Sequence, residues 1–132
     1  MYRIVYISTP KPDIGPADVA GILETGRKNN IRNEITGLLV QDSRRFLQYL
    51  EGEQDAVETT FARISCDNRH LAIIPLKMGL IGRRQFPDWA MASRLVGINN
   101  SLENTVAELV KNCDHDVAIE LLDFAKARDR AA

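Results

Sequence analysis

Two polar residues, Tyr6 and Gln48, stand at positions where a plain hydrophobic core has apolar side chains. Residues 2–8 and 45–50 alternate as β-strands do, and each alternation points its polar residue inward. A buried glutamine amide has two donors and an acceptor to satisfy, and each group left unpaired costs about 1–3 kcal/mol. A hydrogen bond with the Tyr6 hydroxyl meets part of this need. The rest requires another polar partner, either a buried water molecule or a ligand.

The predicted end of the first helix carries two more amides, Asn29 and Asn30. Asparagine at such a position favours a C-terminal cap, because it tolerates left-handed backbone geometry. Alternatively, Asn30 offers its amide to a ligand that has both a donor and an acceptor. This helix end is expected close to the sheet that carries Tyr6 and Gln48. Amides in this arrangement suit a flat heterocycle with an imide edge.

A charged stretch ends the second predicted helix and includes Arg63, Asp67, Arg69 and His70. It forms either a solvated helix end or the polar edge of a cofactor site. Together with Cys66, these residues match no standard zinc spacing, so we expect no metal site.

Near residue 90, Trp89 and Met91 share one face of the last predicted strand, where an aromatic ring and a soft sulfur favour core filling. The pair Arg83-Arg84 favours a solvated loop over a phosphate grip. The sequence has no phosphate-binding glycine loop, and neither histidine has a nucleophile beside it. These residues therefore do not indicate an enzyme.

The chain has 132 residues, which suits one domain with a sizeable core. Its 17 basic and 18 acidic residues give a net charge of −1, which argues against non-specific nucleic-acid binding. No apolar run approaches the length of a transmembrane helix, and the sequence begins with a strand-like pattern rather than a signal peptide. The two cysteines are expected as reduced thiols. We therefore expect a soluble, cytoplasmic domain with no membrane partner.

Hydrophobic periodicity predicts the order β-α-β-β-α-β-β. The predicted strands cover residues 2–8, 35–40, 45–50, 71–78 and 89–96, and the predicted helices cover 16–30 and 54–65. A turn is expected at Asp42-Ser43-Arg44, the third strand is expected to stop at Gly52, and Pro75 favours an edge strand or a bulge. This order is typical of an α+β fold, a ferredoxin-like mixed sheet with both helices on one face.

The C-terminal part of the chain offers cover for the other face of the sheet. Apolar residues at helical spacing form two stripes there, namely Leu102, Val106, Leu109 and Val110, followed by Val117, Leu121 and Phe124. We therefore expect a single domain, with a core at residues 1–95 and a two-helix extension at 96–132 that covers the bare face.

Taken in order, several segments resemble the BLUF family of flavin-based blue-light sensors. The similar segments are Tyr6-x-Ser8, Asn30 with Ile35-Thr36-Gly37-Leu38-Leu39, Phe46-Leu47-Gln48-Tyr49-Leu50-Glu51-Gly52, Ile64-x-x-Asp67-x-Arg69-His70 and Arg84-x-Phe86-x-x-Trp89-x-Met91. The resemblance implies a ferredoxin-like sheet with non-covalent FAD between its two helices, a place that FMN or riboflavin can also take. The sequence departs from some members at Asn29, where they carry His, and at Tyr49, where they carry Trp. Tyr49 is expected on the sheet face away from the flavin.

The resemblance also implies roles for individual residues. Tyr6 is expected to donate an electron and a proton to the excited flavin. Gln48 is expected to bridge the Tyr6 hydroxyl and the flavin, and then to rearrange or tautomerise. Asn30 is expected to bind the imide edge of the ring. Further cofactor contacts are expected from Asn29, Arg63, Asp67, Arg69 and His70, and a signalling role is expected for Ser8, Trp89 and Met91.

Short members of the family act through assembly or through a separate protein. The resemblance therefore implies a homo-oligomer and a downstream partner, which family analogy suggests is a response regulator or a cyclic-di-GMP enzyme. Two alternatives stay open. The first is a light-insensitive flavoprotein with a redox or storage role. The second is a cofactor-free interaction module on a ferredoxin-like scaffold.

Overall fold

The computed structural model describes residues 1–11, 16–41, 46–67, 70–88, 92–95 and 102–131. In chain order its elements are β1 (Tyr2–Pro10), α1 (Pro16–Arg32), β2 (Thr36–Gln41), β3 (Phe46–Gly52), α2 (Gln54–Ser65), β4 (His70–Leu80), β5 (Ala92–Leu95), α3 (Leu102–Leu109) and α4 (His115–Ala131). The predicted order of strands and helices is confirmed, and α2 has the predicted bounds.

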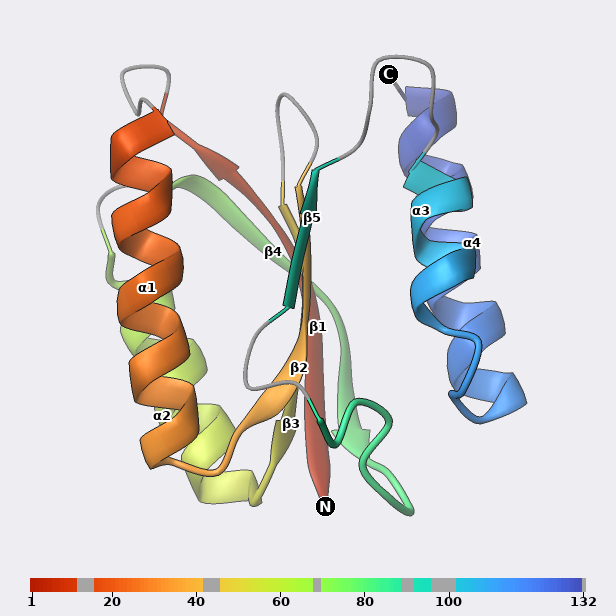
Figure 1. Ribbon diagram of the computed structural model, residues 1–132, viewed down its shortest axis with the longest axis horizontal. Helices are drawn as coiled ribbons and strands as arrows, with labels where there is room; N and C mark the ends of the chain where they lie inside the picture. The colour runs from red at the N-terminus through yellow and green to blue at the C-terminus, as the bar shows by residue number, and fades with distance from the viewer. Residues whose placement is uncertain (12–15, 42–45, 68–69, 89–91, 96–101, 132) are drawn as a thin grey trace.

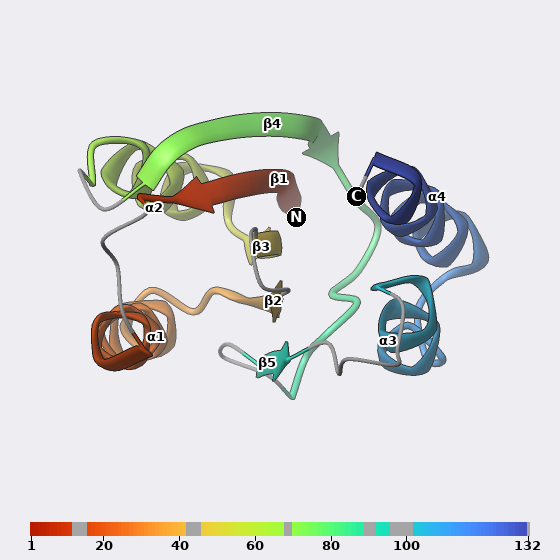
Figure 2. The same cartoon turned by 90° about the horizontal axis from the view of Figure 1, so that it is seen from above.

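The five strands of the described residues form one mixed sheet in the order β4-β1-β3-β2-β5. Strand β1 pairs antiparallel with β3 and β4, β2 pairs antiparallel with β3, and β5 runs parallel to β2. Helices α1 and α2 lie on one face of the sheet, and α3 and α4 lie on the other (Figures 1 and 2). The predicted ferredoxin-like α+β fold, with the C-terminal helices covering the second face, is therefore confirmed.

The alternation of side chains along β1, β2 and β3 divides the interior into two cores. The core under α2 contains Ile4, Tyr6, Ile35, Leu39, Phe46, Leu50 and Val57. The core under α3 and α4 contains Val5, Leu38, Val40, Leu47, Tyr49, Phe86, Val106, Val110, Val117, Leu121 and Ala125. Each central strand therefore contributes to both cores, and adjacent residues of one strand face different helices.

Gly37 permits the close pairing of β2 and β3. A Cβ atom at this position would lie 1.8 Å from the backbone oxygen of Tyr49, far inside van der Waals contact. Gly37 pairs with Leu50, two residues along β3 from Gln48, so the absence of a side chain keeps β2 close to the strand that carries the candidate site.

The end of α1 corrects one prediction. Asn29 and Asn30 lie inside the helix, which continues to Arg32, and neither is its C-terminal cap. The backbone oxygen of Asn30 instead accepts a hydrogen bond from the Ile35 N–H at 2.8 Å, and Glu34 adopts the left-handed conformation with φ 55°. Together with the Glu34 N–H to Ile31 oxygen bond, this is a Schellman ending in which Glu34 takes the position usually held by glycine.

The strand ends also differ from the predictions. Strand β3 stops at Gly52 as predicted, whereas β1 and β4 extend together beyond their predicted ends, so that Pro10 pairs with His70. Pro75 lies in the edge strand β4, at an irregularity of the pairing opposite Tyr6, which confirms the position predicted from its being a proline. The predicted turn at Asp42-Ser43-Arg44 lies outside the described residues.

None of the helices in the described part of the chain combines the length and apolar character needed to cross a membrane.

Candidate functional site

Tyr6 and Gln48 face each other across neighbouring strands. They are directly paired in the β1–β3 register, and the Tyr6 hydroxyl donates a hydrogen bond to Gln48 Oε1. The Tyr6 side chain is fully buried, and its ring packs edge-on against Phe61 of α2 with centroids 5.2 Å apart. Gln48 is half-buried, on the same sheet face. The predicted Tyr–Gln contact is therefore present.

Burial also sets the acid–base state of Tyr6. Loss of solvation raises the pKa of its hydroxyl far above the ordinary value for tyrosine. At neutral pH the hydroxyl keeps its proton and holds that proton toward Gln48. A proton held this way is available only to a group that reaches the buried Tyr6–Gln48 pair.

Asn30 and Ser8 add polar groups beneath the same helices. Asn30 is 2% exposed and lies in the last turn of α1, and the buried residue Ile35 follows just before β2 begins at Thr36. Ser8 points to the same sheet face as Tyr6, and its hydroxyl is buried with no hydrogen-bond partner among the described residues. A buried hydroxyl without a partner is costly in a plain core, so its presence fits a face that receives a polar ligand.

The other predicted cofactor residues that the structure describes lie at the C-terminal ends of α1 and α2. Arg63 is exposed in the last turn of α2, and Asp67 is half-buried just beyond that helix. Asn29 is half-buried and accepts a hydrogen bond from Arg32 at 3.0 Å. Arg69, Trp89 and Met91 lie outside the described residues, as does the side chain of His70, the first residue of β4.

Groups that suit a flavin are therefore present between the sheet and its first two helices. A flavin ring edge offers both hydrogen-bond acceptors and an imide donor, which match the hydroxyl and amide chemistry of Tyr6, Gln48 and Asn30. The described residues contain no group of three histidine, cysteine or acidic side chains able to hold a metal ion. The polar side chains of Tyr6, Gln48 and Asn30 are neutral hydrogen-bonding groups, which a flat heterocycle can use.

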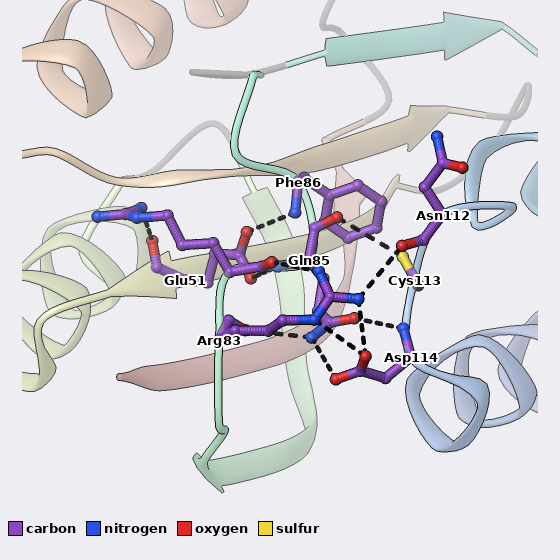
Figure 3. A network of polar contacts seen from close by, with 8 residues as sticks. Glu51, Arg83, Gln85, Phe86, Asn112, Cys113 and Asp114 are labelled. Atoms are coloured by element: carbon purple, nitrogen blue, oxygen red, sulfur yellow. Dashed lines mark hydrogen bonds and ion pairs between the residues drawn. The ribbon is translucent and has the colours of Figure 1, made fainter.

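The sequence patterns did not indicate a second polar cluster, which lies on the opposite sheet face and centres on Glu51 of β3 (Figure 3). Glu51 is fully buried, which is unusual for a carboxylate, and the residues beside it along the strand are apolar. The available signal was the strand alternation, which points Glu51 inward together with Leu47 and Tyr49. Its partners are distant in sequence.

The prediction of a solvated Arg84 is wrong, since Arg84 is half-buried and donates to Thr36 Oγ1 at 2.9 Å.

Comparison with known proteins gives a consistent result. Residues 1–92 match the family model described as BLUF, sensors of blue-light using FAD. The chain is 28% identical over 113 residues to the photoactivated adenylate cyclase subunit beta of Euglena gracilis, a match that covers 83% of this chain and 13% of that protein. The chain thus spans a small part of the length of this curated relative.

Two solved structures are similar over most of the chain. BlrB, a BLUF protein in its dark state, has a TM-score of 0.75 and 29% identity, and the match covers 96% of each chain. A bacterial light-regulated adenylyl cyclase has a TM-score of 0.69 and 35% identity, with 84% of this chain and 32% of that chain covered. The matching family model describes sensors, which agrees with the expectation of a photosensory rather than a catalytic role for these residues.

Proposed function

Since the chain belongs to the BLUF family of flavin-binding blue-light sensors, we propose that it is a photoreceptor that binds FAD non-covalently and signals to a separate protein. The observation that carries the proposal is the hydrogen bond from the buried Tyr6 hydroxyl to Gln48, on the sheet face covered by α1 and α2. Neither a redox flavoprotein nor a cofactor-free module needs this pair at this place.

Two side chains are proposed to hold the flavin ring directly. Gln48 bridges the ring and the Tyr6 hydroxyl, and Asn30 binds the imide edge. The remaining proposed contacts with the cofactor are Asn29, Arg63, Asp67, Arg69 and His70, and Ser8, Trp89 and Met91 are proposed to take part in signalling.

When bound, the flavin absorbs blue light and can accept an electron and a proton. Tyr6 supplies both, with the proton passing along its hydrogen bond toward Gln48, and Tyr6 later regains both. No net oxidation remains after the electron and the proton return. The lasting change is then a reoriented or tautomerised Gln48 amide. The two hydrogen-bond arrangements must differ by only a few kcal/mol for light to shift the population.

The test is an absorption spectrum of the purified protein, reconstituted with FAD, in darkness and directly after blue light. We expect an oxidised-flavin spectrum that shifts slightly to the red and recovers in the dark. Gln48→Leu and Tyr6→Phe should each bind flavin and lose the shift, because each removes one end of the hydrogen bond. The matched variants Gln54→Leu and Tyr2→Phe should keep it, since Gln54 is exposed on α2 and Tyr2 is only partly buried.

Three results would contradict the proposal in different ways. A flavin spectrum that only bleaches in light would point to redox chemistry. A protein that takes up no FAD would point to an interaction module. A reversible red shift that survives Gln48→Leu would show that another residue forms the switch. Reconstitution with FMN in parallel tests whether the adenosine monophosphate part of FAD is needed.

We further propose that the output is a change in assembly or in binding to a partner. The similar Euglena protein is a photoactivated adenylate cyclase, in which the matched region is a small part of a longer chain. By analogy, the partner of this chain is a response regulator or an enzyme of cyclic-nucleotide signalling, such as a cyclic-di-GMP enzyme, and the protein itself assembles as a homo-oligomer. Size-exclusion chromatography in darkness and under blue light tests the assembly.

A further inference from the structure

The buried carboxylate of Glu51 fastens the segment after β4 to strand β3. Its two oxygens accept hydrogen bonds from the Gln85 N–H at 2.7 Å, the Phe86 N–H at 2.7 Å and the Thr36 hydroxyl at 3.0 Å. A buried carboxylate without donors is very costly, so the loss of any of these bonds is unfavourable. The backbone of residues 85 and 86 is thus held directly to β3 at Glu51.

Gln85 continues the connection to the C-terminal helices. Its Nε2 donates to Asp114 Oδ2 at 3.0 Å, and its Oε1 accepts from the Asp114 N–H at 2.7 Å. Asp114 directly precedes α4, and its backbone oxygen accepts the hydrogen bond of Ala118 at 2.9 Å. Figure 3 shows the Gln85 and Asp114 side chains pointing toward each other from the two segments. Gln85 is 4% exposed, so its amide is shielded from water, whereas the Asp114 side chain is about half exposed.

A second contact ties the same segment to β3. The ring of Phe86 packs edge-on against Tyr49, with centroids 5.2 Å apart, in the core under α3 and α4. Tyr49 is the residue directly after Gln48 and faces the opposite side of the strand. Tyr49 and Glu51 thus connect the part of β3 next to Gln48 with Phe86 and Gln85.

We propose that Glu51 and Gln85 are positioning residues that carry the change at Gln48 through the sheet to the turn between α3 and α4. This inference rests on the proposed photosensory function. Neither residue touches the face that holds the cofactor. Their role is to couple the start of α4 to β3, so that a shifted strand loosens the Gln85–Asp114 pair.

The amide of Asp114 reports directly on this pair, because its N–H is held by Gln85. The experiment measures hydrogen exchange of this amide by NMR on the FAD-bound protein, in darkness and under steady blue light. In the unaltered chain we expect light to speed the exchange about tenfold. In Gln85→Leu we expect fast exchange in both conditions and an unchanged red shift of the flavin, since the substitution leaves the cofactor face intact.

Arg83→Gln is the matched control. Arg83 also binds Asp114, at 2.7 Å, but both side chains are about half exposed and the pair is worth little. This variant should keep the light-dependent exchange. A normal flavin red shift with no light effect on Asp114 in the unaltered chain would overturn the inference alone, whether or not any variant folds. Absence of the red shift itself would overturn the proposed function.

Discussion

At the scale of single residues, the two buried tyrosines predict how stability depends on pH. Burial raises the pKa of Tyr6 and of Tyr49 well above the ordinary value, and the nearby charge of Glu51 raises that of Tyr49 further. The folded protein thus keeps both protons at a pH where the unfolded chain has lost them. Stability is therefore unaffected by these groups below the unfolded pKa near 10, and it falls as the pH rises above that value.

We expect the free energy of unfolding to decrease between about pH 8 and about pH 11, and Tyr49→Phe to make this decrease smaller. Urea unfolding of both proteins at the two pH values measures the effect. Part of the decrease should persist in the variant, because burial also raises the pKa of Cys113 to about 11. An equal decrease in both proteins would show that Tyr49 ionises as easily when folded as when unfolded.

Sequence patterns predicted those residues of the candidate site whose sheet face follows from strand alternation. Strand alternation was enough to place Tyr6 and Gln48 on one face, and the structure pairs them directly. The same alternation points Glu51 inward, but its donors come from β2 and from residues 85 and 86. No local pattern shows which distant segment will satisfy a buried carboxylate, so that cluster emerged only from the structure.

At the scale of elements, the end of α1 stores backbone strain that a substitution can relieve. Glu34 has a φ of 55°, in the left-handed region where a side chain costs about 1–2 kcal/mol. Glycine avoids this cost. Its greater conformational entropy in the unfolded chain, however, lowers the free energy of unfolding by about 0.5–1 kcal/mol. We therefore expect Glu34→Gly to raise the free energy of unfolding by about 0.5–1 kcal/mol, as measured by urea denaturation.

Glu34→Ala is the control for this prediction, since it removes the same side chain but keeps a Cβ atom. It should give no stabilisation. The hydrogen bond from Arg84 to the Glu34 backbone oxygen, at 2.7 Å, is available in both variants. Equal stabilisation by Ala and Gly would mean that the carboxylate, rather than the backbone conformation, is unfavourable at this position.

Element ends were harder to predict than element types for a related reason. The predicted bounds of α2 agree with the structure because its apolar spacing and its flanking residues are local signals. Strand β4 is longer than predicted because its length is fixed by pairing with β1, from Tyr2 opposite Leu80 to Pro10 opposite His70. A strand boundary set by a partner is not encoded in the strand alone.

At the scale of the whole molecule, α3 and α4 complete the second core. Val106, Val110, Val117 and Leu121 lie against the sheet residues of that core, and all four are buried. Helix α4 is also joined to β1 by a largely buried ion pair between Arg3 and Glu120. The apolar stripes of the extension were visible in the sequence, whereas this ion pair joins residues at opposite ends of the chain.

Removing residues 102–132 should leave the sheet unable to stay folded in solution. The face that α3 and α4 cover presents Val5, Leu38, Val40 and Leu47, and a contiguous apolar surface of this kind promotes aggregation. We expect the shortened chain to bind a hydrophobic dye and to scatter light, whereas a chain that ends at Ala127 should stay folded because Ala125 is the last core residue among the side chains that the structure describes. A shortened chain that is monomeric and unfolds in one sharp transition would instead show that residues 1–101 form an independent domain and that the helices are an appendage.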